Sequence, residues 1–184
     1  LVGPTQDPHK REFAREGRNV PLEDVVRSAR PTVLVGVSGT TGLFTEAILR
    51  DLPERPLVLP LSNPTQQSEC TPEEVRRSTR GGLVATGSPF PGTTQCNNVY
   101  IFPGVGLGVL AARASRVSDS MFLSAARALA SMATEEELSR GLLLPPIPQI
   151  RRIILEIART VAKEAAYSGP IEQWEPVYLP YRPC

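Results

Sequence analysis

Residues 32–37 read Thr-Val-Leu-Val-Gly-Val, and this short run decides the fold. It is almost wholly apolar and rich in β-branched residues, which favour strands. A continuous apolar run of this length predicts a strand buried on both faces, as in a parallel sheet. Two similar runs, at residues 57–61 and 83–86, predict two more strands.

Helical segments alternate with these strands. Pro21, followed by acidic residues, begins a helix, because proline suits a first turn and acids favour the positive end of the helix. Residues 44–49 form a second helix, and Thr71 and Pro72 stand as the N-cap and first residue of a third. This alternation predicts an α/β fold with a doubly wound parallel sheet.

The last third of the chain is predicted to be helical. Residues 104–115 are rich in glycine and alanine and suit a tightly packed helix, and residues 121–129 have amphipathic spacing. Thr134 caps a short helix that begins with three glutamates. Apolar residues between Ile150 and Ala165 recur at i, i+3, i+4 and i+7, which predicts a long helix with one apolar face.

Composition limits the possible partners. The 184 residues carry 20 basic and 19 acidic side chains, which gives no reason to expect nucleic acid or an anionic membrane surface as a partner. No apolar stretch reaches the ~20 residues that span a bilayer.

The chain starts with Leu1 and lacks a signal peptide, so we read this start as the cut end of a longer protein. Cys70, Cys96 and Cys184 are odd in number and far apart, so neither a disulfide framework nor a zinc site is indicated.

A glycine-rich turn follows the first strand. Residues 36–42 read Gly-Val-Ser-Gly-Thr-Thr-Gly and lead into the next helix. Glycines there let a ligand approach the backbone, and a helix N-terminus attracts anions. Such turns also occur without a ligand, and the GxGxxG pattern is absent, so the segment alone leaves both interpretations open.

Two amide-bearing segments lie next to apolar runs. Residues 62–65 read Ser-Asn-Pro-Thr and follow the second strand, and Asn97 and Asn98 precede the apolar residues 99–104. Open α/β sheets hold ligands at the carboxyl ends of their strands. An amide both donates and accepts hydrogen bonds without adding charge to a site. Each segment could alternatively be a turn or a helix cap.

Taken together, these segments resemble the malic enzyme family. The matching motifs are VGVSGTTGLFTE, LSNPT, ATGSPF and NNVYIFPG. The resemblance covers roughly residues 10–168 and falls on the second half of the family's NAD(P)-binding domain. It implies an incomplete, Rossmann-like sheet followed by C-terminal helices, with residues 1–168 in this domain and residues 169–184 as an extended, Pro-rich tail.

The resemblance also implies binding residues. Asn63 binds malate and touches the nicotinamide ribose, while Asn97 contacts the substrate carboxylate with Asn98 beside it. Lys10 stands where a lysine accompanies a preference for NADP in this family, although it could equally be a surface lysine. The implied cofactor-binding residues are Val37, Ser38, Gly39, Ser62, Asn63, Gly87 and Lys10.

The resemblance further implies that the parent protein is an oxidoreductase. It would convert malate to pyruvate and CO2 while reducing NAD or NADP, with Mg2+ or Mn2+ as the metal. By this resemblance, the family's catalytic Tyr and Lys, its three acidic metal ligands and its Gly-rich fingerprint are expected upstream of Leu1. We therefore expect no catalytic or metal-binding residue in this segment and no activity from it alone. The expected partners are malate, the nicotinamide cofactor, the N-terminal part of the enzyme and a second copy in a homo-oligomer. The expected location is the cytoplasm, with the mitochondrial matrix and the plastid as alternatives.

Two alternatives to an enzyme segment follow from the same residues. One is a nucleotide-binding module that has kept the fold and lost the chemistry. The other is a subunit-interaction module that docks through the Pro-rich tail.

Overall fold

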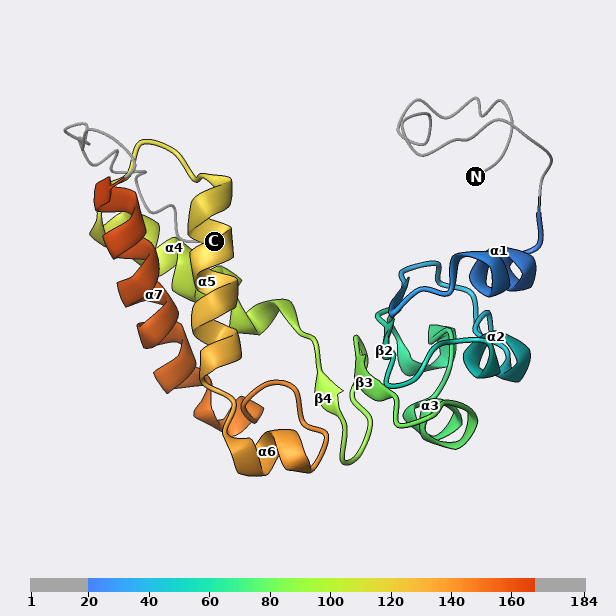
Figure 1. The fold of residues 1–184 in the computed structure, drawn as a ribbon. Coiled ribbons are helices and arrows are strands. Elements are labelled where there is room, and N and C mark those ends of the chain that lie inside the picture. The colour runs from blue at the N-terminus through green and yellow to red at the C-terminus, as the bar shows by residue number, and fades with distance from the viewer. Residues whose placement is uncertain (1–19, 168–184) are drawn as a thin grey trace, which may run out of the picture. The chain divides into compact units, whose positions relative to one another are not determined.

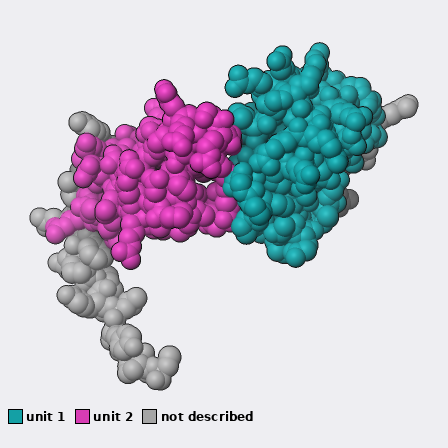
Figure 2. All heavy atoms as spheres, turned by 90° about the horizontal axis from the view of Figure 1, so that it is seen from below, with its two compact units in different colours: residues 1–93 teal, residues 94–184 magenta. Residues whose placement is uncertain are grey.

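The structure, a computed structural model, describes residues 20–167. The chain divides into two compact units, residues 1–93 and residues 94–184 (Figure 2). Lys10 and the tail predicted at residues 169–184 lie outside the described residues.

Unit 1 is built on a parallel sheet. Its strands are β1 (Val33–Gly36), β2 (Leu57–Pro60) and β3 (Leu83–Thr86). β1 pairs with β2 in parallel, and β2 pairs in parallel with β3. The three strands predicted from apolar runs are therefore confirmed to within one residue at each end.

Three helices accompany these strands: α1 (Leu22–Ala29), α2 (Glu46–Arg50) and α3 (Pro72–Ser78). The predicted cap of α3 is confirmed. The Thr71 side chain accepts a hydrogen bond from the backbone N–H of Glu74, whose own carboxylate accepts one from the backbone N–H of Thr71. This reciprocal arrangement is a capping box, and it satisfies two N–H groups that the first turn leaves unpaired.

The prediction that β1 is buried on both faces is wrong. Leu34 is buried, but Val33 and Val35, on the other side of the strand, are 48% and 52% exposed. Successive parallel strands joined by right-handed crossovers place their helices on one face of the sheet. The helices of unit 1 share a single apolar core with that face and lie to one side of the sheet (Figure 1).

Unit 2 is helical apart from the short strand β4 (Thr94–Gln95). Its elements are the 3-10 turn η3 (Asn98–Tyr100), α4 (Phe102–Ala111), α5 (Asp119–Ser131), α6 (Glu135–Ser139), the 3-10 turn η4 (Ile147–Gln149) and α7 (Ile150–Tyr167). The four helices predicted here are confirmed, whereas β4 and both 3-10 turns were not predicted. Within residues 20–167, none of the helices combines the length and apolar character needed to cross a membrane.

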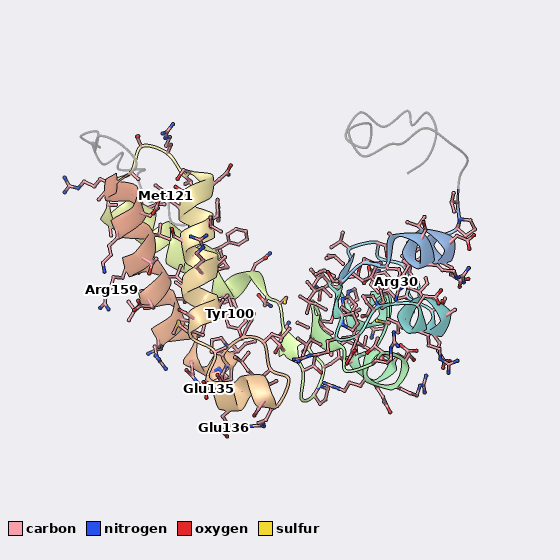
Figure 3. The ribbon with its side chains drawn as sticks, in the orientation of Figure 1. Arg30, Tyr100, Met121, Glu135, Glu136 and Arg159 are labelled. Atoms are coloured by element: carbon pink, nitrogen blue, oxygen red, sulfur yellow. The ribbon has the colours of Figure 1, made fainter. Side chains whose placement is uncertain are left out.

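Close packing of helices holds unit 2 together. Residues from α4, α5 and α7 form one apolar core together with Tyr100 of η3, and Met121 of α5 belongs to it (Figure 3). The predicted tight packing of the Gly-rich helix is confirmed at Gly108, where an added Cβ would lie 2.6 Å from the carbonyl oxygen of Ala158 in α7. Tyr100 is buried, and its hydroxyl donates to the carbonyl oxygen of Pro145 at 2.6 Å.

Candidate functional site

The candidate site lies at the carboxyl ends of the three parallel strands of unit 1. Ser38 and Gly39 follow β1, Ser62 and Asn63 follow β2, and Gly87 follows β3. Because the strands are parallel, these ends share one edge of the sheet. Hydrogen bonds between the loops bring these residues together into a single polar cluster.

Glu69 joins the first two loops. Its carboxylate oxygen Oε1 accepts hydrogen bonds from the Ser38 backbone N–H at 2.7 Å, the Ser38 hydroxyl at 2.9 Å and the Ser62 hydroxyl at 2.5 Å. Oε2 lies 3.4 Å from the backbone N–H of Ser62. The carboxylate is therefore held by two backbone and two hydroxyl donors, although the Glu69 residue has no exposed surface.

These hydrogen bonds set the charge of Glu69. Burial by itself would raise the pKa of this carboxyl, because it disfavours the charged form. Hydrogen bonds from Ser62 and Ser38 outweigh burial and hold the pKa of Glu69 below its ordinary value. Glu69 is therefore a buried, ionised carboxylate at neutral pH.

Asn63 is linked to the third loop through Ser88. The Ser88 hydroxyl lies 2.7 Å from Asn63 Oδ1 and 3.2 Å from the carbonyl oxygen of Ser62. Asn63 Nδ2 makes only a long contact of 3.5 Å with the carbonyl oxygen of Leu61. If the Asn63 amide were turned by 180°, its Oδ1 would face the carbonyl oxygen of Leu61, and both are acceptors. The orientation with Oδ1 at Ser88 is therefore favoured, and Nδ2 is the group that this exposed side chain offers to a ligand. The Asn63–Pro64 peptide bond is cis.

The absence of a side chain at Gly87 allows the chain after β3 to pack against Leu61, directly after β2. A Cβ at this position would lie 2.1 Å from the carbonyl oxygen of Leu61. Gly87 is buried, so its lack of a side chain serves a contact with the protein's own backbone, and its predicted role in cofactor binding stays a prediction.

Backbone donors of the Gly-rich turn after β1 are paired within the protein. The N–H of Gly39 donates to the Ser62 hydroxyl at 2.8 Å, and the N–H of Thr40 donates to the Ser38 hydroxyl at 3.1 Å. With the N–H of Ser38 bonded to Glu69, three consecutive backbone donors are already paired. These three N–H groups are therefore not offered to a ligand, and anion binding at the N-terminus of the following helix stays a prediction.

The other predicted residues divide between the two units. Val37 lies beside the cluster in sequence and is 76% exposed. Asn97 and Asn98 are exposed residues of unit 2. Asn97 caps η3, with its Oδ1 accepting from the Val99 N–H at 2.9 Å, so the turn-and-cap alternative describes its present contact.

Sequence reasoning missed Glu69 and Ser88 as members of the cluster. Ser62 was predicted to face the cofactor, but it is only 7% exposed and its hydroxyl donates to Glu69. The available signal for Glu69 was its position directly before Cys70 and Thr71, the N-cap of α3. Its role was hidden because Ser38, its hydrogen-bond partner, is far away along the chain.

Acidic residues elsewhere do not form a metal site. Glu135 and Glu136 are exposed on the first turn of α6 (Figure 3). Across residues 20–167, no group of three or more His, Cys, Asp or Glu side chains is arranged to hold a metal ion. The described residues therefore do not fit the divalent metal that the family resemblance implies.

Parallel strands that alternate with helices, with polar loops gathered at the strand ends, define an α/β protein, and ligands of such proteins bind at these ends. The family profile described as "Malic enzyme, NAD binding domain" matches residues 5–166. The chain therefore belongs to the malic enzyme family.

Individual relatives agree with this assignment. An NAD-dependent malic enzyme of Sodalis glossinidius is 49% identical over 93% of this chain, and one of Psychrobacter cryohalolentis is 54% identical over 78%. The chain spans 35% and 28% of these two proteins. The crystal structure of a malic enzyme from Pyrococcus horikoshii matches 74% of this chain with a TM-score of 0.65 and 31% identity, and the match covers 30% of that structure.

Proposed function

We propose that the whole protein to which these residues belong oxidises malate and decarboxylates it to pyruvate and CO2 with reduction of a nicotinamide cofactor. The observation that carries this proposal is the amide of Asn63. Its oxygen is fixed by Ser88, and its Nδ2 is presented at the exposed ends of the strands. A fixed, uncharged donor can bind a substrate oxygen without adding charge to the site.

In this proposal, the loops after β1 and β2 form the wall against which the nicotinamide half of the cofactor rests. The paired N–H groups of Ser38, Gly39 and Thr40 leave a surface suited to the ribose rather than to the pyrophosphate. Bound NAD would supply the hydride acceptor. The residues of this chain bind and orient it, and Asn63 positions malate next to it. Asn97 and Asn98 are proposed to bind the substrate carboxylate.

We propose NAD rather than NADP as the cofactor. The two bacterial relatives compared above are both named NAD-dependent malic enzymes. The sequence-based preference for NADP depended on Lys10 alone, and Lys10 lies outside the described residues. Comparing kcat/KM for the two cofactors tests this choice, and a larger value for NADP would contradict it.

The acid–base residues and the metal ligands are proposed to come from the rest of the protein, in keeping with the short span of the match. Residues 1–184 alone are then expected to be inactive. Adding the missing part as a separate polypeptide should restore malate-dependent reduction of the cofactor. Association of the two parts without activity would instead favour the subunit-interaction alternative.

Substitution of Asn63 tests the proposed site directly. In the full-length protein, Asn63→Ala should lower kcat/KM by roughly 2–4 kcal/mol of transition-state stabilisation, the scale of one preorganised hydrogen bond. Gln149→Ala is a matched control, because it removes an amide from η4 in unit 2. Equal kcat/KM for the wild type and Asn63→Ala would remove Asn63 from the site.

A further inference from the structure

Glu69 is a charged side chain that the proposed chemistry does not use. It lies between η2 (Thr65–Gln67) and α3, with no exposed surface. A buried carboxylate is costly unless hydrogen bonds replace its water. The four donors from Ser38 and Ser62 replace it here. Such a group is maintained only where its hydrogen bonds are fully made.

The ionised carboxylate dictates how both serine hydroxyls point. A carboxylate only accepts, so the single hydrogen of each hydroxyl is directed to Glu69. The remaining lone pairs of Ser62 and Ser38 then accept from the N–H groups of Gly39 and Thr40. One charge therefore orders two hydroxyls, which in turn pair two backbone donors of the turn after β1.

The backbone around Glu69 is fixed to the same turn. The N–H of Phe44 donates to the carbonyl oxygen of Glu69 at 3.0 Å, and the N–H of Gly42 donates to that of Ser68 at 3.3 Å. Gly36 provides the space for the side chain, because a Cβ there would lie 2.6 Å from Glu69 Cδ. Both the main chain and the side chain of Glu69 are therefore held against the turn.

We propose that Glu69 is a positioning residue that sets the spacing between the Ser38–Gly39 loop and the Ser62–Asn63 loop for cofactor binding. This inference rests on the proposed function. Glu69 lies beneath the loops and acts through the two serines, so it touches neither cofactor nor substrate. Its contribution is preorganisation: loops already fixed in their bound form lose less entropy when the cofactor binds.

Glu69→Gln is the primary test in the full-length protein. Glutamine keeps the size of the side chain, but its neutral carbonyl oxygen is a weaker acceptor than the carboxylate. Whichever way the amide lies, its NH2 group faces a backbone N–H, that of Ser62 or that of Ser38. The dissociation constant for NAD, measured by calorimetry, and the KM for NAD should each rise about tenfold, whereas kcat should fall much less.

Glu74→Gln is the matched control. The Glu74 carboxylate also accepts from a backbone N–H and a hydroxyl, both of Thr71, at 2.7 and 3.0 Å. It lies in the capping box of α3, so its loss should lower stability and leave the dissociation constant for NAD within about twofold. An equal rise in that constant for both glutamine variants would reduce Glu69 to a structural role and overturn the proposal.

Hydrogen exchange separates this proposal from the proposed function. In the unliganded wild type, the N–H groups of Ser38, Gly39 and Thr40 should be protected although the turn is exposed. Glu69→Gln should speed their exchange, and Glu74→Gln should not. These exchange rates do not depend on whether the protein acts on malate. Unchanged exchange in Glu69→Gln would overturn the proposal.

Ser38→Ala is a milder variant for the case in which Glu69→Gln does not fold. It removes one hydroxyl from the cluster and leaves the carboxylate bonded to Ser62. We expect the dissociation constant for NAD to rise a few-fold, about the effect of one hydrogen bond in an ordered loop. Wild-type affinity in Ser38→Ala would contradict the role assigned to the cluster.

Discussion

The two units are stabilised in different ways. Unit 1 contains nearly all the buried polar side chains of the described residues, among them Ser62, Glu69, Thr86 and Ser88, whereas unit 2 contributes only Thr94 to that group. The core of unit 2 is an apolar cluster between α4, α5 and α7.

This difference follows from what each unit has to hold in place. Burying polar groups is costly, and their hydrogen bonds recover stability only when all are made. Hydrogen bonds are directional, however, so they can fix a loop in one geometry, whereas apolar packing is not directional. Unit 1 must hold three strand-end loops in place, whereas unit 2 must hold helices, which packing alone can achieve.

Core truncation should affect both units equally and is the largest effect that we expect. Ile157 in unit 2 and Ile48 in unit 1 are both buried. Replacing either by alanine should lower the free energy of unfolding by roughly 2–5 kcal/mol, because a cavity remains. Urea unfolding followed by circular dichroism measures both. A loss at Ile48 far below that at Ile157 would mean that the apolar core contributes much less to unit 1.

The next effect is specific to unit 2. Gly108→Ala should lower the free energy of unfolding by roughly 1–3 kcal/mol, because its Cβ would meet Ala158 and Val161 of α7. Gly106→Ala lies in the same helix, where a Cβ would meet nothing within 4 Å. It should stabilise the protein by about 0.5–1 kcal/mol, since alanine favours helix. Equal signs for the two variants in urea unfolding would refute close packing of α4 on α7.

A motif shared by both units should behave alike in each. Thr71 in unit 1 and Thr134 in unit 2 each form a capping box with the glutamate three residues later. Alanine at either position should lower the free energy of unfolding by about 1 kcal/mol, and serine should restore most of that loss. Thermal unfolding of the four variants measures the effect. A marked inequality would show that the surroundings, rather than the cap, set the cost.

The smallest effect concerns the cysteines. Burial, together with the charges of Glu74 and Glu69, raises the pKa of the Cys70 thiol to about 12, and burial raises that of Cys96 as well. The thiolate is the reactive form. Iodoacetamide at pH 8 should therefore leave Cys70 of the native protein unmodified, and modification should follow unfolding, as peptide mass spectrometry would show. Rapid modification of native Cys70 would mean that its segment opens readily.

Local patterns predicted most of the fold. The strands and the capped helices depend on residues close together in the chain, so apolar runs and the threonine caps located them. The exposed face of β1 was missed because an apolar run does not reveal on which side its helices pack.

The candidate site was predicted less completely. Asn63, Ser38 and Gly39 belong to recognisable motifs at strand ends, and the structure gathers them there. Glu69 was missed because glutamates are almost always exposed, and its partners lie 7 and 31 positions away along the chain. The roles of Asn97, Asn98 and Lys10 in binding stay predictions.

Gly36 has a consequence for how this sequence can change over evolutionary time. A side chain at Gly36 would collide with Glu69 and with Phe44, so Gly36 can be replaced only if both of these side chains move or become smaller. Loss of the Glu69 carboxylate would in turn leave the serine hydroxyls without their common acceptor. A combinatorial library over Gly36 and Glu69 should therefore recover few functional pairs besides the present one.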